Sequence, residues 1–189
     1  MTAPHRITKT AEDRIPGDLT KDQLIARILR VDQAGELGAV RIYQGQRAIL
    51  GKGRHGPLLT KMAEQEQHHL DTFSRLISER RVRPTMLAPI WHVAGFALGA
   101  ATALMGERAA MACTVAVEEA IDEHYADQHA RLGDDEAELK ATIEKFREEE
   151  LEHRDIGLAN EAEKAPGYPI LSAAIKTGCR MAIWLSERV

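Results

Sequence analysis

The sequence predicts an all-α protein, and three observations carry this prediction. The 189 residues include 28 alanines, aromatic residues make up only 4%, and no long stretch alternates apolar with polar residues. Alanine costs least in a helix, whereas strands favour aromatic and β-branched side chains and alternate in polarity when half-buried. Because 44% of the residues are hydrophobic, the chain can bury a core, and its length suits one domain rather than two.

Six helical segments follow from apolar periodicity and from helix start and stop signals. They cover residues 20–50, 58–81, 85–106, 107–132, 135–164 and 170–187. The first opens at Thr20, where Thr-Lys-Asp-Gln has the pattern of a capping box closed by Gln23. The second ends before Pro84, the fourth at Gly133 and the fifth before Pro166, because these residue types interrupt helices.

Residues 1–19 are expected to form a flexible leader ahead of a single domain over residues 20–189. The leader mixes acidic and basic residues and has no apolar run. These features argue against a secretory signal, and the acidic residues make the segment a poor transit peptide.

Charge and cysteine content exclude several function classes. The formal net charge is −4, so there is no electrostatic case for nucleic acid, which requires a basic surface. Cys113 and Cys179 have no Cys-x-x-Cys partner, which excludes a disulfide framework, a zinc ribbon and a rubredoxin-type iron site. We expect both cysteines to be small buried hydrophobic residues.

Residues 85–106 are unusually apolar: these 22 residues contain no Asp, Glu, Lys or Arg. Their number would suit a membrane span, but Pro89, Gly95 and Gly99 reduce the hydrophobicity. We therefore favour a buried or membrane-docked helix over a spanning one. Trp91 and Trp184 are either interfacial anchors or ordinary core residues.

Three predicted helices place glutamates on the stripe that should be apolar. Glu36 interrupts the stripe of the first helix, Glu66 that of the second and Glu150 that of the fifth. A buried carboxylate without a partner is too costly for a folded protein to retain. A positive partner must therefore meet these carboxylates in the core.

The two halves of the chain repeat one pattern: a glutamate, a tyrosine seven residues later, and a Glu-x-x-His motif 30 or 32 residues after the first glutamate. The repeated residues are Glu36, Tyr43, Glu66 and His69 in the first half and Glu118, Tyr125, Glu150 and His153 in the second. Residues three apart share a helix face, so the Glu and His of each motif can bind one metal ion.

Four glutamates and two histidines from four helices are the ligand set of the ferritin-like di-metal carboxylate proteins. Mixed imidazole and carboxylate ligation suits iron, or less often manganese. The sequence thus predicts a ferritin-like four-helix bundle of two repeated helix pairs, plus additional membrane-associated helices. The predicted metal site is made by Glu36, Glu66, His69, Glu118, Glu150 and His153. The alternative without metal is a salt-bridged bundle whose Glu and His residues face water.

Other polar residues near these motifs are given weaker roles. Tyr43 and Tyr125 are either core tyrosines or hydrogen-bonding partners beside the metals. We expect the remaining candidates to lie at the surface; they are Asp71, Asp155, His68, His124 and His129.

On these residues the sequence resembles the demethoxyubiquinone hydroxylase family of quinone biosynthesis. The matching stretches are residues 30–39, 112–119, 146–157 and 178–188. The resemblance implies a di-iron monooxygenase that hydroxylates the ring of a polyprenylated methoxy-benzoquinol, 5-demethoxyubiquinol. The family's six ligands fall on the six residues that the repeat selects. The chain departs at Gln33, where the family usually has a histidine that is not a ligand.

The resemblance also implies cofactors, partners and location. The cofactors would be two iron ions, with O₂ and an external two-electron donor as co-substrates. The chain has no nucleotide-binding glycine pattern and no flavin or iron–sulfur motif, so the electrons must come from a transiently bound donor or from the quinol itself. The resemblance implies that NADH or the quinol can serve. The expected partners are a polyprenyl quinol, other ubiquinone-biosynthesis proteins and a membrane surface. Peripheral attachment would be to the cytoplasmic face of a bacterial inner membrane or to the mitochondrial inner membrane. Assembly into a homo-oligomer is a further possibility.

Two other function classes are compatible with the residues. One is a ferroxidase or iron-handling protein built on the same four-helix site. The other is a non-catalytic lipid-binding helical module whose carboxylates are structural. The apolar segment over residues 85–106 argues against the soluble surface that an iron-storage shell requires.

Overall fold

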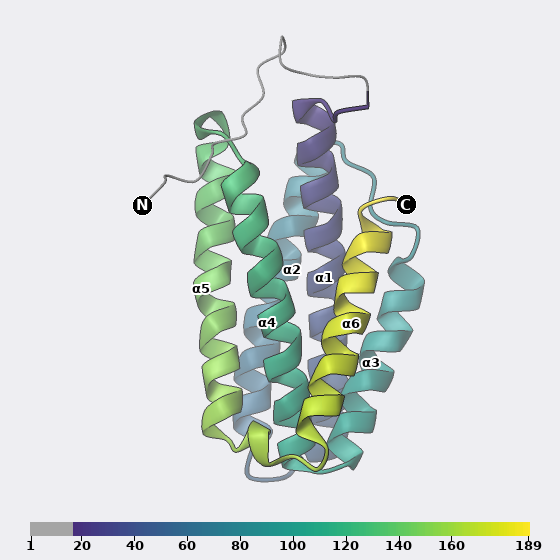
Figure 1. Cartoon of the computed structure of the whole chain (residues 1–189), viewed down its shortest axis with the longest axis vertical. Coiled ribbons are helices and arrows are strands. Elements are labelled where there is room, and N and C mark those ends of the chain that lie inside the picture. The colour runs from purple at the N-terminus through teal and green to yellow at the C-terminus, as the bar shows by residue number, and fades with distance from the viewer. Residues whose placement is uncertain (1–16) are drawn as a thin grey trace.

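Six α-helices carry most of the regular structure in the computed structural model, which describes residues 17–189 (Figure 1). The helices are α1 (Lys21–Leu50), α2 (Gly56–Glu79), α3 (Ala88–Leu104), α4 (Glu107–Arg131), α5 (Ala137–Ala159) and α6 (Tyr168–Ser186). Short 3₁₀ turns cover Asp134–Glu136 and Ala162–Lys164. No strand occurs among these residues, so the all-α prediction is confirmed. The predicted leader lies almost entirely outside the described residues.

The helix ends follow local chemistry. The capping box of α1 is present: Thr20 Oγ1 accepts from the Gln23 backbone N–H at 3.1 Å, and the Gln23 side chain accepts from the Thr20 N–H at 2.9 Å. The predicted helix over 135–164 is wrong at both ends, where the chain forms 3₁₀ turns instead. Glu161, two residues after the end of α5, has a left-handed φ of 63°. A continuing α-helix cannot accommodate this angle.

The apolar third helix is also shorter than predicted. Thr85 Oγ1 accepts from the Leu87 N–H at 3.2 Å, which holds residues 85–87 in a turn before the helix begins. Gly106, with a φ of 113°, ends the segment. Across the described part of the chain, no helix has both the length and the apolar character that crossing a membrane requires.

Two helix pairs form the bundle, because α1 packs against α2 and α4 packs against α5. The other two helices lie on one side of it: α3 packs against α1, and α6 packs against α4 (Figure 1). Gly99 lets α3 approach closely, since a Cβ at this position would overlap the carbonyl oxygen of Ile42 in α1. The glycines that weaken the segment as a membrane span are therefore packing positions against the bundle.

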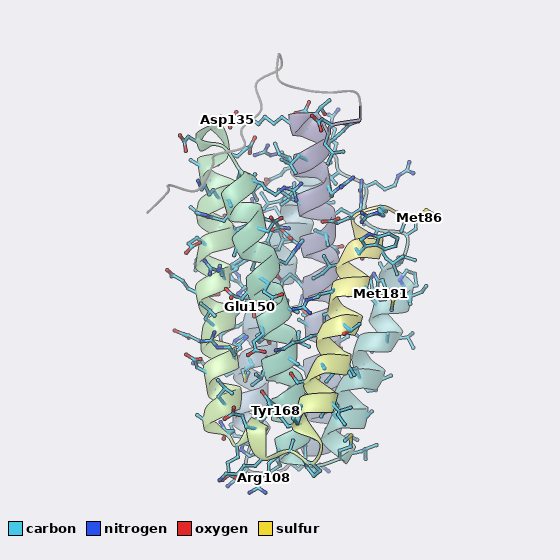
Figure 2. The ribbon with its side chains drawn as sticks, viewed as in Figure 1. Met86, Arg108, Asp135, Glu150, Tyr168 and Met181 are labelled. Carbon is cyan, nitrogen blue, oxygen red and sulfur yellow. The ribbon has the colours of Figure 1, made fainter. Side chains whose placement is uncertain are left out.

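Two apolar clusters fill the bundle above and below its middle. One joins the start of α1 and α5 to the end of α2 and α4, with Phe73 and Phe146 among its buried side chains. The other joins the opposite ends of the same helices and includes Leu59 and Met111. Glu150 lies midway along the bundle (Figure 2). The polar residues near it are therefore enclosed between two hydrophobic layers.

Candidate metal centre

The six residues selected by the repeat meet in the middle of the bundle. Glu36 comes from α1, Glu66 and His69 from α2, Glu118 from α4, and the second Glu-x-x-His motif from α5. All six are at least 99% buried. They form two overlapping groups whose candidate ligand atoms lie within 4.8 Å of one another: Glu36, Glu66, His69 and Glu150 in one, and Glu66, Glu118, Glu150 and His153 in the other.

Two glutamates are shared by these groups, so each could bridge two metal positions. Glu66 and Glu150 belong to both groups, whereas Glu36 and Glu118 each belong to one. A metal ion in either group would thus have two shared carboxylates, one unshared carboxylate and one imidazole as candidate ligands. The two groups exchange equivalent residues of the two halves of the repeat, so the cluster relates the helix pairs by an approximate twofold symmetry.

Both histidines direct the same ring nitrogen toward the centre. His69 Nδ1 lies 3.1 Å from Glu150 Oε1 and 3.6 Å from Glu36 Oε2. His153 Nδ1 lies 2.9 Å from Glu66 Oε1 and 3.4 Å from Glu150 Oε2. The Nδ1 atoms are therefore the candidate metal ligands, and the Nε2 atoms point outward.

Several buried oxygens of the cluster accept no hydrogen bond from the described residues. They are both carboxylate oxygens of Glu66 and the Oε2 atoms of Glu36, Glu118 and Glu150. Buried carboxylates normally find donors or cations, because leaving them unpaired costs free energy. The oxygen and imidazole donor set, together with these orphaned oxygens, fits two first-row divalent ions such as iron or manganese.

Burial raises the pKa of Glu66 and Glu118 well above the usual range, and the neighbouring carboxylates, Glu150 first, raise it further. Burial lowers the pKa of His69, but hydrogen bonds and charges of Glu150 and Glu36 outweigh this effect and raise it to about 12. The raised pKa values of Glu66 and Glu118 show that these buried carboxylates lack enough positive charge around them to stay ionised. Two divalent ions would supply it and keep the glutamates ionised.

Each repeat tyrosine contacts the terminal glutamate of the other half. The Tyr43 hydroxyl donates to Glu118 Oε1 at 2.8 Å, and the Tyr125 hydroxyl donates to Glu36 Oε1. Burial and the nearby carboxylates raise the pKa of both phenols well above the usual range, so they remain protonated donors. Of the two alternatives for the tyrosines, hydrogen bonding beside the cluster is what the geometry supports.

A polar cluster next to the centre is not among the features predicted from the sequence. Asp32, one turn before Glu36, is buried and accepts a hydrogen bond from Gln128 Nε2 at 2.6 Å. His124 Nε2 lies 3.6 Å from Asp32 Oδ1, and the His124 side chain is 13% exposed. The expectation that His124 lies at the surface is therefore wrong, because α4 turns it toward α1. The position of Asp32 on the core stripe was the available signal.

The other peripheral predictions have mixed outcomes. His68, Asp71 and Asp155 are exposed, as expected. His129 is partly exposed and lies 3.7 Å from Glu144 Oε2. Cys113 is buried, and Cys179 is partly buried against the same apolar cluster.

An apolar cavity of about 520 Å³ lies between α1, α3, α4 and α6. On α1 the cavity is lined by Gly35, which directly precedes Glu36, and by Ala39, about one turn after it. On α4 it is lined by Val117, which directly precedes Glu118. Trp91 and Ser186 line it too, and the Trp91 Nε1–H donates to Ser186 Oγ at 2.9 Å. A hydrophobic space thus lies on the α3 and α6 side of the carboxylate cluster.

Together, the six helices and the buried carboxylate–histidine cluster are those of a ferritin-like helical bundle whose core could hold metal ions. The comparison with known families is more specific. The family described as Ubiquinone biosynthesis protein COQ7 matches residues 23–186. The chain belongs to this family.

Curated relatives agree along most of the chain. A Rhodospirillum rubrum protein named 3-demethoxyubiquinol 3-hydroxylase is 66% identical over 182 residues, which is 96% of this chain and 86% of its own length. A human protein named NADPH-dependent 3-demethoxyubiquinone 3-hydroxylase, mitochondrial, is 55% identical over 87% of this chain and 78% of its own. The yeast 5-demethoxyubiquinone hydroxylase, mitochondrial, is 43% identical over 86% and 77%.

Proposed function

We propose that this protein is an O₂-dependent di-iron monooxygenase that hydroxylates the ring of a polyprenylated methoxy-benzoquinol, 5-demethoxyubiquinol, in ubiquinone biosynthesis. The observation that carries the proposal is the convergence of six buried Glu and His residues in two overlapping groups. The names of the relatives, all hydroxylases of demethoxyubiquinone or its quinol, support the substrate class.

The chain's own residues would organise the metal site. Glu66 and Glu150 would bridge, while Glu36 with His69 and Glu118 with His153 would complete the two positions. When bound, two iron ions would supply the redox chemistry that activates O₂. Tyr43 would hold Glu118, and Tyr125 would hold Glu36, so that each terminal carboxylate keeps its orientation.

The apolar cavity supports a route for the substrate. Its lining is almost entirely apolar and borders the helix turns that carry Glu36 and Glu118. A polyprenyl tail would occupy this space between α3 and α6, because burying it there removes hydrocarbon from water. The quinol ring would then lie toward the carboxylate cluster, where the metal ions would bind.

Exposed apolar residues on the same side support docking to a membrane surface. Met86 just before α3, Ile90 and Val93 on α3, and Met181 and Trp184 on α6 are all more than half exposed. Figure 2 labels Met86 near the start of α3 and Met181 on α6. A lipid surface here would let the substrate tail pass from the bilayer into the cavity. Attachment would be peripheral, to a bacterial or mitochondrial inner membrane.

The reaction requires a two-electron donor from outside the chain. One oxygen atom enters the ring as hydroxyl and the other leaves as water, which consumes two electrons and two protons. NADH or the quinol itself was expected from the resemblance, whereas the name of the human relative specifies NADPH. We propose a nicotinamide or the quinol as donor. We also propose that other ubiquinone-biosynthesis proteins are partners of this chain.

Iron quantification combined with a product assay tests the proposal. Purified protein supplied with iron, a demethoxyquinol, a reductant and air should hold two irons per chain and form the hydroxylated ring. Glu150→Ala should lose both iron and product, while Glu152→Ala, at an exposed position on the same helix, should lose neither. Iron oxidation in large shells without quinol consumption would favour the ferroxidase alternative. Absence of bound iron would favour the lipid-binding module.

A further inference from the structure

The two candidate metal positions have matching ligands but different outer partners. His69 Nε2 lies 2.6 Å from the carboxylate oxygen Oε2 of Glu149. His153 Nε2 lies 3.3 Å from the amide oxygen Oε1 of Gln65. Gln65 and Glu149 occupy equivalent places in the repeat, each directly before the glutamate of a Glu-x-x-His motif. The approximate twofold relation is thus broken at the residues that hold the histidines.

This difference changes what each histidine offers a cation. Nδ1 of both rings faces the centre, so with a cation bound there Nε2 carries the proton and donates it outward. A carboxylate acceptor forms a charge-assisted hydrogen bond, which increases the electron density at the ligating nitrogen. A longer hydrogen bond to a neutral amide increases that electron density only weakly. His69 Nδ1 is therefore a stronger electron-pair donor to a metal ion than His153 Nδ1.

Neighbouring groups preserve the contrast. The His69 ring stacks on Phe146 with centroids 4.0 Å apart, which fixes the ring plane and the direction of its Nε2–H. Lys145 Nζ lies 3.6 Å from the other oxygen of Glu149, but the lysine side chain is 59% exposed. Water screens an ion pair at such a position, so Glu149 keeps most of its negative potential toward His69.

We propose that Glu149 and Gln65 are positioning residues that make the two metal positions unequal. The position bounded by Glu36 and His69 fills first with a divalent ion, and an iron there has a lower reduction potential than an iron bounded by Glu118 and His153. This inference rests on the dinuclear site of the proposed function and adds the order in which its two positions bind metal.

Single-position variants measure the effect directly. His153→Ala leaves the His69 position, and His69→Ala leaves the His153 position; each apoprotein is titrated with Co²⁺ against a chelator. Glu149→Gln should weaken Co²⁺ binding about 10-fold in the first background and leave the second unchanged. Gln65→Glu should strengthen binding by a similar factor in the second background alone. Glu148→Gln, the same charge change at the exposed neighbouring residue, is the matched control.

The full ligand set provides a second readout that does not depend on alanine variants. With one equivalent of ⁵⁷Fe(II), the wild-type protein should show a single dominant Mössbauer doublet. The exchange variant carrying both Glu149→Gln and Gln65→Glu should shift the dominant doublet to the other position. Two metal ions binding with equal affinity in the wild type, or Glu149→Gln behaving like Glu148→Gln, would overturn this inference alone. Failure of every variant and the wild type to bind metal would instead contradict the proposed function.

Discussion

The Tyr43 hydroxyl crosses the bundle to donate a 2.8 Å hydrogen bond to Glu118 Oε1, although the two residues lie in different halves of the repeat. Tyr125 makes the reciprocal bond to Glu36. The repeated halves are thus locked together at the residues that would be terminal ligands. A tyrosine seven residues after each glutamate serves the other half's glutamate rather than its own.

Tyr43→Phe should weaken metal binding at the Glu118 position by about 10-fold, because Glu118 Oε1 loses its buried donor and the carboxylate loses its fixed orientation. The apoprotein should keep its helical content, since the ring stays in place. Metal affinity measured by chelator competition checks the prediction. Tyr168→Phe, which removes a hydroxyl from a partly exposed tyrosine at the start of α6, is the control, and an equal effect there would contradict it.

Gly99→Ala should displace α3 from its packing position against α1. A Cβ at Gly99 already overlaps the carbonyl oxygen of Ile42, so α3 must move away from α1 and reshape the cavity. We expect a loss of about 1–3 kcal/mol in the free energy of unfolding and a loss of quinol hydroxylation with the metal content retained. Urea unfolding and metal analysis measure the two effects.

The matched control is Gly178→Ala on α6, where a Cβ would meet no described atom within 4 Å. It lines the same cavity and should fold at least as well as the wild type, because alanine is the better helix former. Equal destabilisation by both substitutions would show that helical glycine itself, and not contact with Ile42, matters.

Ile90→Asp and Met181→Asp should each weaken binding to lipid vesicles. Both side chains are more than half exposed on the face beside the cavity. An apolar side chain that inserts among acyl chains contributes about 1.5–3 kcal/mol to the free energy of membrane binding. The aspartate variants lose this contribution, so the affinity for vesicles should fall by 10-fold or more. Co-sedimentation with phospholipid vesicles measures it, with Leu158→Asp, an exposed apolar residue on α5, as control. Unchanged binding of both variants would contradict docking through this face.

Much of the bundle and of the cluster could be predicted because both depend on periodicity within single helices. Glu36, Glu66 and Glu150 interrupt apolar stripes, and the repeat selects Glu118 by its spacing to Tyr125. The structure brings all of these together. Their role as metal ligands remains a prediction until metal is measured.

The features that could not be predicted depend on relations between helices or on rare backbone geometry. Whether His124 faces Asp32, and whether Glu149 reaches His69, is decided by the register of α4 against α1 and of α5 against α2. The early end of α5 depends on a left-handed conformation at Glu161, a residue type with no preference for it. The position of Asp32 on the core stripe signals its burial, but no local pattern marks His124 as its partner, Glu149 as the partner of His69, or the backbone conformation of Glu161.

Metal removal should make stability depend on pH in a specific direction. In the apoprotein, burial and then neighbouring carboxylates raise the pKa of Glu66 and Glu118 above the values of an unfolded chain. A raised pKa means that the folded state binds more protons, so the associated stability is present at low pH and is lost as pH rises past the ordinary glutamate range. For His69, with a pKa raised to about 12, the same sign applies above its ordinary value of 6.5.

Glu150 has the opposite sign, because burial raises its pKa but hydrogen bonds from His153 and His69 outweigh this and lower it to about 2. Its contribution is lost only as pH falls below the ordinary glutamate value, so it is constant between pH 5 and 8. The apoprotein should therefore have its higher melting temperature at pH 5 and its lower one at pH 8.

Bound metal should reverse this trend. Divalent ions stabilise the ionised carboxylates, and ions at 100 times their dissociation constant add about 2.7 kcal/mol to the free energy of unfolding. Because protons compete with the metal, the stabilisation should grow from pH 5 to pH 8. Calorimetric melting of apo and iron-loaded protein at both pH values measures the difference. A melting temperature of the apoprotein that rises from pH 5 to pH 8, as in the loaded protein, would mean that the buried glutamates are already satisfied without a cation.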